Sequence, residues 1–286
     1  AMGIYKVMTD VFPGKKMAIL LATFLVPSFL YWTSGLHKEG LIFTGVSMVI
    51  YIIYFSLKEN KLTAKRFLLI FVSLLLILAL RNFIIIILLP AILAWLLANR
   101  WSKYGLAIFA SLYLFFGILF FTLRYIDSRL DFPQAVVNKQ QEFIQLKGGN
   151  SSIPIKQLQP TAISFLKTTP QAINLSTIRP YPSDVRHILS LAAAIEINAL
   201  LLMFILFIFF PGPNGNHSKN LAYFCIFFSF SLLLAIGFSV NNLGAIVRYR
   251  SIIMPLLIIP MAAQIDWKRL GLLFTGDIKN KLNKNY

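Results

Sequence analysis

The sequence predicts an all-α, polytopic integral membrane protein, and three observations lead to this fold class. Hydrophobic residues make up 58% of the 286 residues, whereas soluble domains are nearer about 45–50% apolar. The mean hydropathy is +0.74, and charged residues contribute only 13%. The apolar residues also gather in long stretches separated by short polar segments, which is the pattern of membrane-spanning helices.

About eight such stretches can be drawn as spans. They cover residues 17–32, 40–57, 66–80, 83–98, 104–122, 189–211, 220–238 and 251–265. Several are shorter than the roughly 20 residues of a straight span, so we expect their ends to extend or the bilayer to thin. Arg81-Asn82 separates two short stretches. One long kinked span is the alternative there, but two spans with a tight turn suit the length better. Four prolines are candidate helix breaks: Pro27, Pro90, Pro255 and Pro260.

The distribution of Lys and Arg predicts the orientation of the chain in the membrane. One set of short loops and termini is the more basic and carries Lys6, Lys15, Lys16, Lys58, Lys61, Lys65, Arg66, Arg100, Lys103, Lys219, Lys268, Arg269, Lys279, Lys281 and Lys284. The opposite short loops carry Lys38, Arg81, Arg248 and Arg250. We therefore expect both termini in the cytoplasm. Residues 123–188 are expected outside, because long loops translocate largely regardless of their charge.

Four regions follow from this threading. Residues 1–122 form a five-span bundle, 123–188 an extracytoplasmic loop, 189–265 a three-span bundle and 266–286 a basic cytoplasmic tail. The first residues, Ala1-Met2-Gly3, begin no signal-peptide pattern. If the chain is a fragment, upstream membrane helices or partner subunits are expected.

The long loop is predicted to carry short amphipathic helices. Residues 133–147 have helical spacing of apolar residues, and the run Gly148-Gly149-Asn150-Ser151-Ser152 is a flexible break. Residues 161–166 and 171–178 are predicted as two short helices, opened by Pro160 and Pro170. Such helices commonly lie on the membrane surface.

The formal charge of +17 narrows the class of partner. The excess is spread over membrane-flanking segments, so membrane lipids and lipid-linked phosphates are the expected partners. Nucleic acid is not expected, because no basic run is interleaved with aromatic residues on a soluble domain. Cys225 is the sole cysteine, and the three histidines are far apart in sequence. We therefore predict no metal site and no cofactor.

Basic residues on the predicted outer face suggest an anionic substrate. Arg248-Tyr249-Arg250 precedes the last span, and Arg can chelate phosphate with two hydrogen bonds. The two arginines could not face the same way on a helix, but in an extended segment they could. Arg81 and Arg179 are on the same predicted face. The alternative for each arginine is an ordinary anchor at the headgroups.

Two acidic residues are candidates for catalysis. Glu39 follows Lys38 in the short loop after the first span; a self-neutralising ion pair in a polar hairpin is the alternative. Glu196 is about seven residues into the stretch 189–211, roughly 10 Å below the outer surface. A carboxylate at that depth is a functional candidate by default; a structural ion pair or protonation are the alternatives.

The segment from Pro27-Ser28 through Trp32, Ser34-Gly35 and Lys38-Glu39 resembles the "PS…FW-S-G…K-E/D" segment of bacterial polysaccharide-assembly proteins. These are polymerase-like proteins and GT-C-like glycosyltransferases that use polyprenyl-phosphate-linked sugars. Arg179-Pro180-Tyr181-Pro182, followed by a span with Glu196, resembles an "RPFP" motif, and Arg248-Tyr249-Arg250 with Pro255 resembles a closing "RYR…P" segment. One departure is that Glu39 is the single acid in the first outer loop.

The resemblance implies a bacterial inner-membrane protein that transfers or polymerises polyprenyl-(pyro)phosphate-linked saccharide at the outer face. In this hypothesis the catalytic residues are Glu39, Glu196 and Lys38, and the substrate-binding residues are Arg81, Arg179, Arg248, Tyr249 and Arg250. Two alternatives remain open: a transporter or flippase of an anionic lipid or solute, and a non-catalytic subunit of a larger complex.

Overall fold

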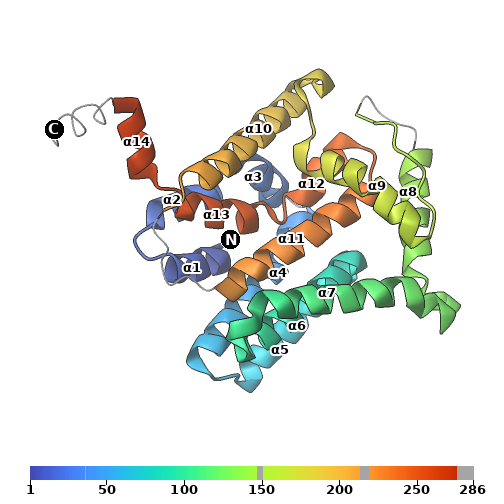
Figure 1. Ribbon diagram of the computed structural model, residues 1–286, viewed down its shortest axis with the longest axis horizontal. Coiled ribbons are helices and arrows are strands. Elements are labelled where there is room, and N and C mark those ends of the chain that lie inside the picture. Colours follow the sequence, from blue (N-terminus) through green and yellow to red (C-terminus); the bar gives the residue numbers. More distant parts are fainter. Residues whose placement is uncertain (36, 147–150, 213–218, 276–286) are drawn as a thin grey trace.

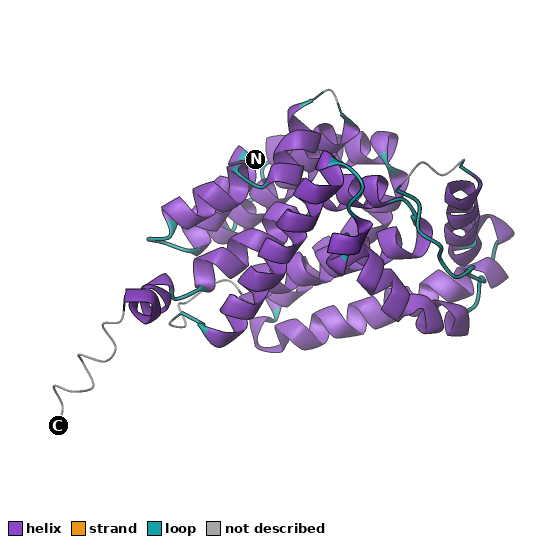
Figure 2. Ribbon diagram, turned by 90° about the horizontal axis from the view of Figure 1, so that it is seen from above, coloured by secondary structure: helices purple, strands orange, loops and turns teal. Residues whose placement is uncertain are grey.

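The chain folds as a bundle of helices. The computed structural model describes residues 1–35, 37–146, 151–212 and 219–275, and no β-strand occurs within those ranges (Figures 1 and 2). The helices are α1 (Met2–Val11), α2 (Lys16–Phe24), α3 (Pro27–Ser34), α4 (Lys38–Glu59), α5 (Ala64–Leu80), α6 (Asn82–Arg100), η1 (Ser102–Tyr104), α7 (Gly105–Thr122), η2 (Leu123–Tyr125), η3 (Ser128–Leu130), α8 (Phe132–Gln145), α9 (Ala162–Ile173), η4 (Asn174–Ile178), η5 (Pro182–Asp184), α10 (Ile188–Phe209), α11 (Lys219–Ser239), α12 (Leu243–Arg250), α13 (Met254–Gln264) and α14 (Trp267–Thr275).

The bundle has two ends, which we name by the segments that lie there. At the loop end, α8 and α9 gather beside α12. At the tail end lie α1, the start of α2 and α14 (Figure 1). The predicted outer loop and the predicted cytoplasmic tail are therefore at opposite ends of the bundle.

The structure has five helices that are long and apolar enough to cross a membrane, and up to seven if each of two bent pairs is one span. The five are α4, α6, η1 to η2 with α7, α10 and α11. With 17 residues, α5 is at the lower limit of length for a span. The all-helical, multi-pass class is confirmed at this level, whereas the count of eight spans stays a prediction.

One predicted span is a broken helix, and another begins at a break. The stretch 17–32 is α2 followed by α3, bent by 54°, whereas the predicted last span, 251–265, covers only α13, which meets α12 at 63°. Pro27 and Pro255 are in the first turns after these breaks, because proline lacks the N–H that would continue the preceding helix. Pro90 and Pro260 lie inside α6 and α13, so they do not end those helices. Arg81 alone separates α5 from α6, as the two-span prediction requires.

The loop prediction was partly wrong. A helix does cover most of 133–147, as α8, but 161–178 is one helical segment, α9 continued by η4, and not two helices. Thr161 caps α9 by accepting a hydrogen bond from the Ser164 amide, and Pro170 lies inside the helix. The hydroxyl groups of Thr168 and Thr169 donate to carbonyls of the preceding turn, which supports the helix where Pro170 has no N–H.

The predicted break at 148–152 is only partly visible. Gly148, Gly149 and Asn150 are outside the described residues. Beyond them the chain pairs with the segment between α11 and α12. The Leu243 amide donates to the Ser151 carbonyl at 3.0 Å, and the Ile153 amide donates to the Asn241 carbonyl at 2.9 Å. This pairing ties the loop to the start of α12.

The loop end is held together by close packing of α9 against α11. The rings of Phe165 and Phe238 are 5.0 Å apart. A Cβ atom at Gly237 would overlap the carbonyl oxygen of Ala172, so the contact requires glycine on α11. The amphipathic segment predicted to lie on the membrane surface thus packs on a membrane helix.

Replacing Gly237 by alanine is therefore expected to push α9 off α11 and to destabilise the protein by about 1–3 kcal/mol. The measurement is thermal unfolding of the purified protein, together with proteolysis of 123–187, which should accelerate. Gly117→Ala on α7 is the matched control, because a Cβ atom there meets nothing within 4 Å. Equal stability of the two variants would contradict the packing argument.

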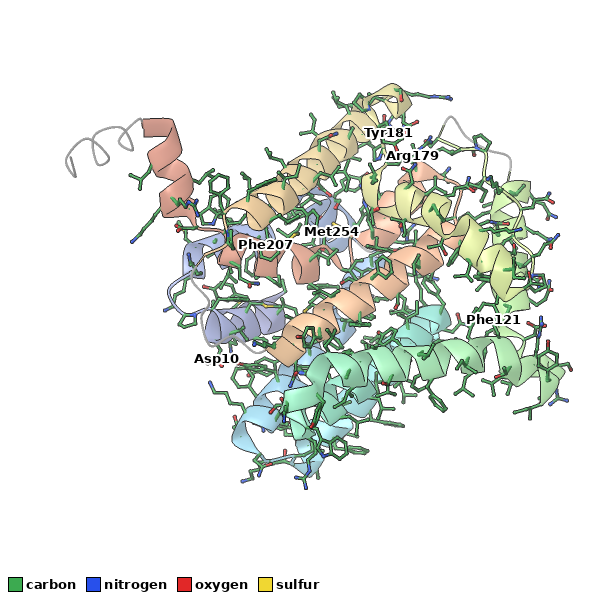
Figure 3. All side chains as sticks on the ribbon, in the orientation of Figure 1. Asp10, Phe121, Arg179, Tyr181, Phe207 and Met254 are labelled. Atoms are coloured by element: carbon green, nitrogen blue, oxygen red, sulfur yellow. The ribbon has the colours of Figure 1, made fainter. Side chains whose placement is uncertain are left out.

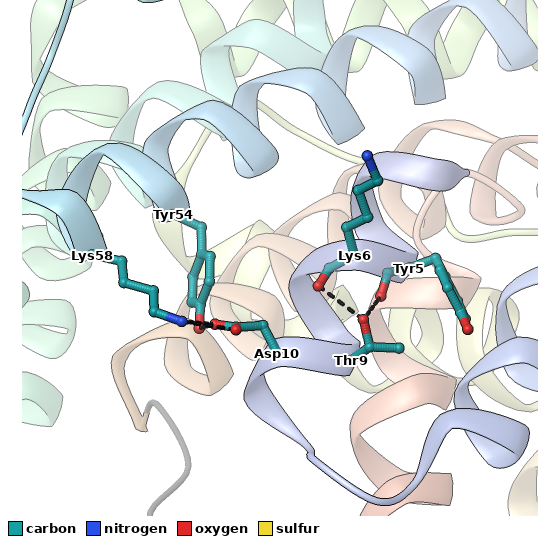
Figure 4. A network of polar contacts seen from close by, with 6 residues as sticks. All are labelled: Tyr5, Lys6, Thr9, Asp10, Tyr54 and Lys58. Carbon is teal, nitrogen blue, oxygen red and sulfur yellow. Dashed lines mark hydrogen bonds and ion pairs between the residues drawn. The ribbon is translucent and has the colours of Figure 1, made fainter.

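At the tail end, α1 is fastened to α4 by a carboxylate. Asp10 accepts hydrogen bonds from Lys58 and from the Tyr54 hydroxyl, each at 2.7 Å (Figure 4). The hydrogen bond from Lys58, followed by that from Tyr54, lowers the pKa of Asp10 below its ordinary value. Sequence reasoning did not predict α1, whose buried residues are Ile4, Val7, Met8 and Val11.

The pKa of Asp10 is lower in the folded protein than in the unfolded chain. The stability that Asp10 contributes is therefore fully present above the ordinary Asp pKa, and it is lost as pH falls through the pKa of Asp10 in the folded protein. Asp10→Asn is therefore expected to flatten the acid limb of the stability–pH curve. The effect should be about 0.2–1 kcal/mol, since Lys58 is exposed. Thermal unfolding across acidic pH checks this. Asp127→Asn is the control, because the Asp127 carboxylate makes no ion pair in the described chain. This variant should show the same loss of stability at acidic pH as the unchanged protein.

Candidate functional site

The centre of the candidate site is Glu39, in the first turn of α4. Its side chain is 0% exposed. Arg81 donates to Oε1 at 2.7 Å, and Arg248 contacts Oε2 at 2.9 Å and Oε1 at 2.8 Å. Both carboxylate oxygens therefore bind guanidinium groups, and the helix N-terminus adds favourable partial charge.

Aromatic rings orient these two arginines. The Arg81 guanidinium lies 3.9 Å from the centre of the Tyr249 ring, and that of Arg248 lies 5.3 Å from the Trp32 ring. Such cation–π contacts stabilise a guanidinium against an apolar surface. We call Glu39, Arg81, Arg248, Trp32 and Tyr249 the Glu39 cluster. It joins four separate parts of the chain: α3, α4, the α5–α6 junction and α12.

The Glu39 cluster is partly open to its surroundings. The Arg248 side chain is 32% exposed and that of Arg81 14%. Lys38 is exposed, and its ammonium group makes no hydrogen bond or ion pair within the described ranges. The residue before Glu39 thus carries an exposed positive charge, and the two arginines of the cluster share a single carboxylate.

Arg250 points elsewhere, because Arg248-Tyr249-Arg250 is helical and not extended. Residues two apart on a helix lie about 200° apart around the axis. Arg250 is 0% exposed and donates to the backbone carbonyls of Arg179 at 2.7 Å and Ser176 at 3.4 Å. It therefore satisfies the carbonyls at the end of η4.

Glu196 performs the complementary task at a helix start. It is 6% exposed, and its Oε2 accepts a hydrogen bond from the Ser28 amide at 2.6 Å. Ser28 is in the first turn of α3, directly after the break in the α2–α3 span. Amides there have no partner in their own helix, so a carboxylate stabilises them.

Glu196 and Arg250 are buried on α10 and α12, which pack against each other and against α3 and η4. We call these two residues, together with Ser28, Ser176 and Arg179, the Arg250 cluster. In the part of the chain that is described, four buried atoms of this cluster have no hydrogen-bond partner: Ser28 Oγ, Glu196 Oε1, Arg250 Nε and Arg250 Nη2. Free donors and acceptors thus face the interior of the bundle.

The eight site residues predicted from sequence thus fall into two groups. Glu39, Arg81, Arg248 and Tyr249 form one cluster with Lys38 at its edge, and Glu196, Arg179 and Arg250 form the other. The Arg179 side chain pairs with Asp184 at 3.5 Å and lies over the Tyr181 ring. Figure 3 labels Arg179 and Tyr181, which lie close together between α10 and α9. The helix α3 links the clusters, since Ser28 and Trp32 are one turn, about 6 Å, apart along it.

Sequence reasoning missed the backbone groups that hold the buried charges. The Ser28 amide and the Ser176 carbonyl have no side-chain signature. Pro27 next to Ser28 was the available signal, because a proline inside an apolar stretch leaves unpaired backbone groups around it. The contact of Arg248 with the Trp32 ring was also not predicted.

An apolar groove lies beside the Arg250 cluster. It has a volume of about 400 Å³, lies between η5 and α10, and is lined by Pro182, Val185, Leu191, Ala194, Ile195 and Asn198. None of the predicted site residues lines it. Its wall on α10 is the first half of a candidate span.

Comparison with protein-family models, curated proteins and solved structures gives no match for this chain. Within the described ranges, no group of three or more His, Cys, Asp or Glu side chains is placed to hold a metal ion.

Proposed function

We propose that the protein is a bacterial inner-membrane glycosyltransferase or polysaccharide polymerase that acts on polyprenyl-(pyro)phosphate-linked saccharide. The observation that carries the proposal is the Glu39 cluster, in which Arg81 and Arg248 converge on one buried carboxylate. Lys38 beside them gives an excess of positive charge. That excess at the end of a membrane bundle suits a phosphate group carried by a lipid.

In the proposed reaction, an acceptor hydroxyl attacks the anomeric carbon of the lipid-linked sugar. The bond from that carbon to the phosphate oxygen breaks, and the lipid (pyro)phosphate leaves with the electron pair. Arg248 and Lys38 bind the leaving phosphate and stabilise its charge. Both carboxylate oxygens of Glu39 are occupied by guanidinium groups, so the role of Glu39 is to position Arg81 and Arg248.

The proton of the acceptor hydroxyl is then assigned to Glu196, whose Oε1 has no partner in the described chain. Its other oxygen is held by the Ser28 amide, which orients the carboxylate. The groove along α10 would take part of the hydrocarbon chain, because its walls are apolar and it lies on a candidate span.

We place the active face outside the cytoplasm and both termini inside. The support is the excess of Lys and Arg in the segments of the tail end over the short segments of the loop end. The Glu39 cluster, the Arg250 cluster and the segment 123–187 would then share the outer face.

The test is a reconstituted assay with a synthetic polyprenyl-pyrophosphate-linked oligosaccharide, in which longer saccharides are detected by mass spectrometry. Arg248→Gln should weaken binding of polyprenyl pyrophosphate and leave binding of uncharged polyprenol unchanged. Arg129→Gln is the control, because Arg129 is exposed and its side chain has no ion pair in the described chain. Glu196→Gln keeps an acceptor for Ser28 and should abolish product while the substrate still binds.

Transport of an anionic lipid or solute is the second candidate, and the two broken spans favour it. Transporters bind their cargo at discontinuous helices. Glu196 accepts from the Ser28 amide at the α2–α3 break, and Arg250 is the last residue of α12, directly before the α12–α13 break. A flux assay in vesicles separates the two: movement of unmodified lipid-linked saccharide without new glycosidic bonds would replace the enzyme proposal.

A further inference from the structure

The C-terminal helix α14 has two chemically distinct faces. Trp267 and Leu270 are three residues apart and therefore share a face, whereas Lys268 and Arg269 are turned away from them. Trp267 is 43% exposed, and both basic residues are exposed as well. Leu270 is half-buried. A helix with Trp and Leu on one face and Lys and Arg on the other is typical of helices that lie in the membrane–water boundary.

The start of α14 is fastened to the ends of two helices. The Asp266 amide donates to the Phe210 carbonyl at 2.9 Å, and Gly212 donates to Gln264 at 2.7 Å. The Trp267 indole donates to the Ala262 carbonyl at 2.8 Å. These contacts hold α14 where α10 and α13 both end, which is the level at which the apolar part of α10 gives way to polar residues.

After its first residues, α14 extends outward from the bundle. Figure 1 shows it projecting at the tail end, beyond α2 and α13, and Figure 2 shows the helix that leads to the C-terminus at the edge of the bundle. Arg269 lies over the Phe210 ring at 5.7 Å and stays exposed. Lys16, at the start of α2, is exposed at the same end. The surface around α14 is therefore positive and borders a candidate span.

We propose that α14 lies in the plane of the membrane boundary and binds anionic phospholipid headgroups through Lys268 and Arg269. Trp267 and Leu270 enter the edge of the hydrocarbon region, and the basic side chains reach the phosphates. Each basic residue near an anionic surface contributes roughly a five-fold preference for it. The inference is independent of the proposed function, because it concerns the opposite end of the bundle.

A lipid surface is favoured over a soluble protein partner by the charge and the place of the helix. The clamp at Phe210 and Ala262 sets α14 at the end of a candidate span, so its apolar face meets lipid without any rearrangement. The basic pair complements anionic headgroups, which cover the whole boundary at this depth.

The experiment uses the full chain in lipid nanodiscs of phosphatidylcholine, with or without phosphatidylglycerol. Cys225 is the sole cysteine and is buried, so Cys225→Ala gives a background for single labels. Leu270→Cys and Lys268→Cys each carry an environment-sensitive fluorophore, and a quencher attached to lipid tails reports contact with the bilayer. Circular dichroism and gel filtration confirm that each variant is folded.

The expected result is stronger quenching and a blue-shifted emission at position 270 than at 268, both increased by phosphatidylglycerol. Adding Lys268→Gln and Arg269→Gln to a Trp267→Cys label should remove the phosphatidylglycerol dependence, as should high salt. Equal access of water to positions 268 and 270 would overturn the in-plane placement. Quenching that is unchanged by phosphatidylglycerol and by the charge substitutions would contradict the binding of anionic headgroups.

Discussion

Replacing Glu39 by glutamine is expected to destabilise the protein by about 3 kcal/mol, because it leaves two guanidinium groups without their shared counter-ion. Glutamine keeps the shape of the side chain, so the loss reports the charge. The Glu39 side chain is fully buried and accepts from both Arg81 and Arg248. The measurement is chemical or thermal unfolding of the purified protein in detergent.

Glu142→Gln is the matched control for this change. Glu142 also forms an ion pair, with Lys139 at 2.6 Å, but both side chains are more than half exposed. Its loss should cost about 0.5 kcal/mol or less. If the two substitutions cost the same, burial does not strengthen the Glu39 pairs, and the cluster is not the structural centre of the loop end.

A double-mutant cycle sharpens the test. Arg248→Gln leaves Glu39 paired with Arg81, so it should cost less than Glu39→Gln. The double variant Glu39→Gln, Arg248→Gln should cost less than the sum of the two single changes, since the pair is lost only once. Additive costs would show that Arg248 is held by the Trp32 ring and not by Glu39.

Replacing Arg250 by methionine is the second change with a large expected effect, again about 3 kcal/mol or more. It removes the donor to the Ser176 and Arg179 carbonyls, and each buried group left without a partner costs about 1–3 kcal/mol. It also removes the buried positive charge of the cluster while the buried Glu196 carboxylate stays. Unfolding measurements and proteolysis near η4 check the result.

Combining Arg250→Met with Glu196→Gln should recover part of the lost stability, because both charges are then gone. Arg186→Met is the control: Arg186 is exposed, and its replacement should change stability by at most about 0.5 kcal/mol. If the double variant is no more stable than Arg250→Met alone, Glu196 and Arg250 are not electrostatically coupled in the folded protein.

The helices of the membrane bundle were the part most open to prediction. Hydropathy is a local property, and the edges of the apolar stretches match helix ends such as Leu80 and Asn82 within a few residues. The breaks at Pro27 and Pro255 were foreseen only as possibilities. Pro90 has the same chemistry, yet α6 continues through it. Whether a proline ends a helix depends on neighbouring helices that can satisfy the freed groups.

The candidate site was harder to predict because it depends on contacts between distant segments. Arg248 and Arg250 were treated as equivalent ligands. The structure separates them because α12 is helical, so that one reaches Glu39 and the other reaches backbone carbonyls. Glu196 was recognised as a buried charge that is costly without a partner. Its partner is the backbone amide of Ser28, which cannot be predicted from residue types because every residue except proline has such an amide.

Composition and the spacing of neighbouring residues were enough to predict an all-helical, multi-pass membrane protein and the positions of its apolar helices. The pairing of each acid with its arginine became visible only in the folded chain, because Glu39 pairs with residues 42 and 209 positions away. Such pairing follows from how helices pack, and packing is a property of the whole chain.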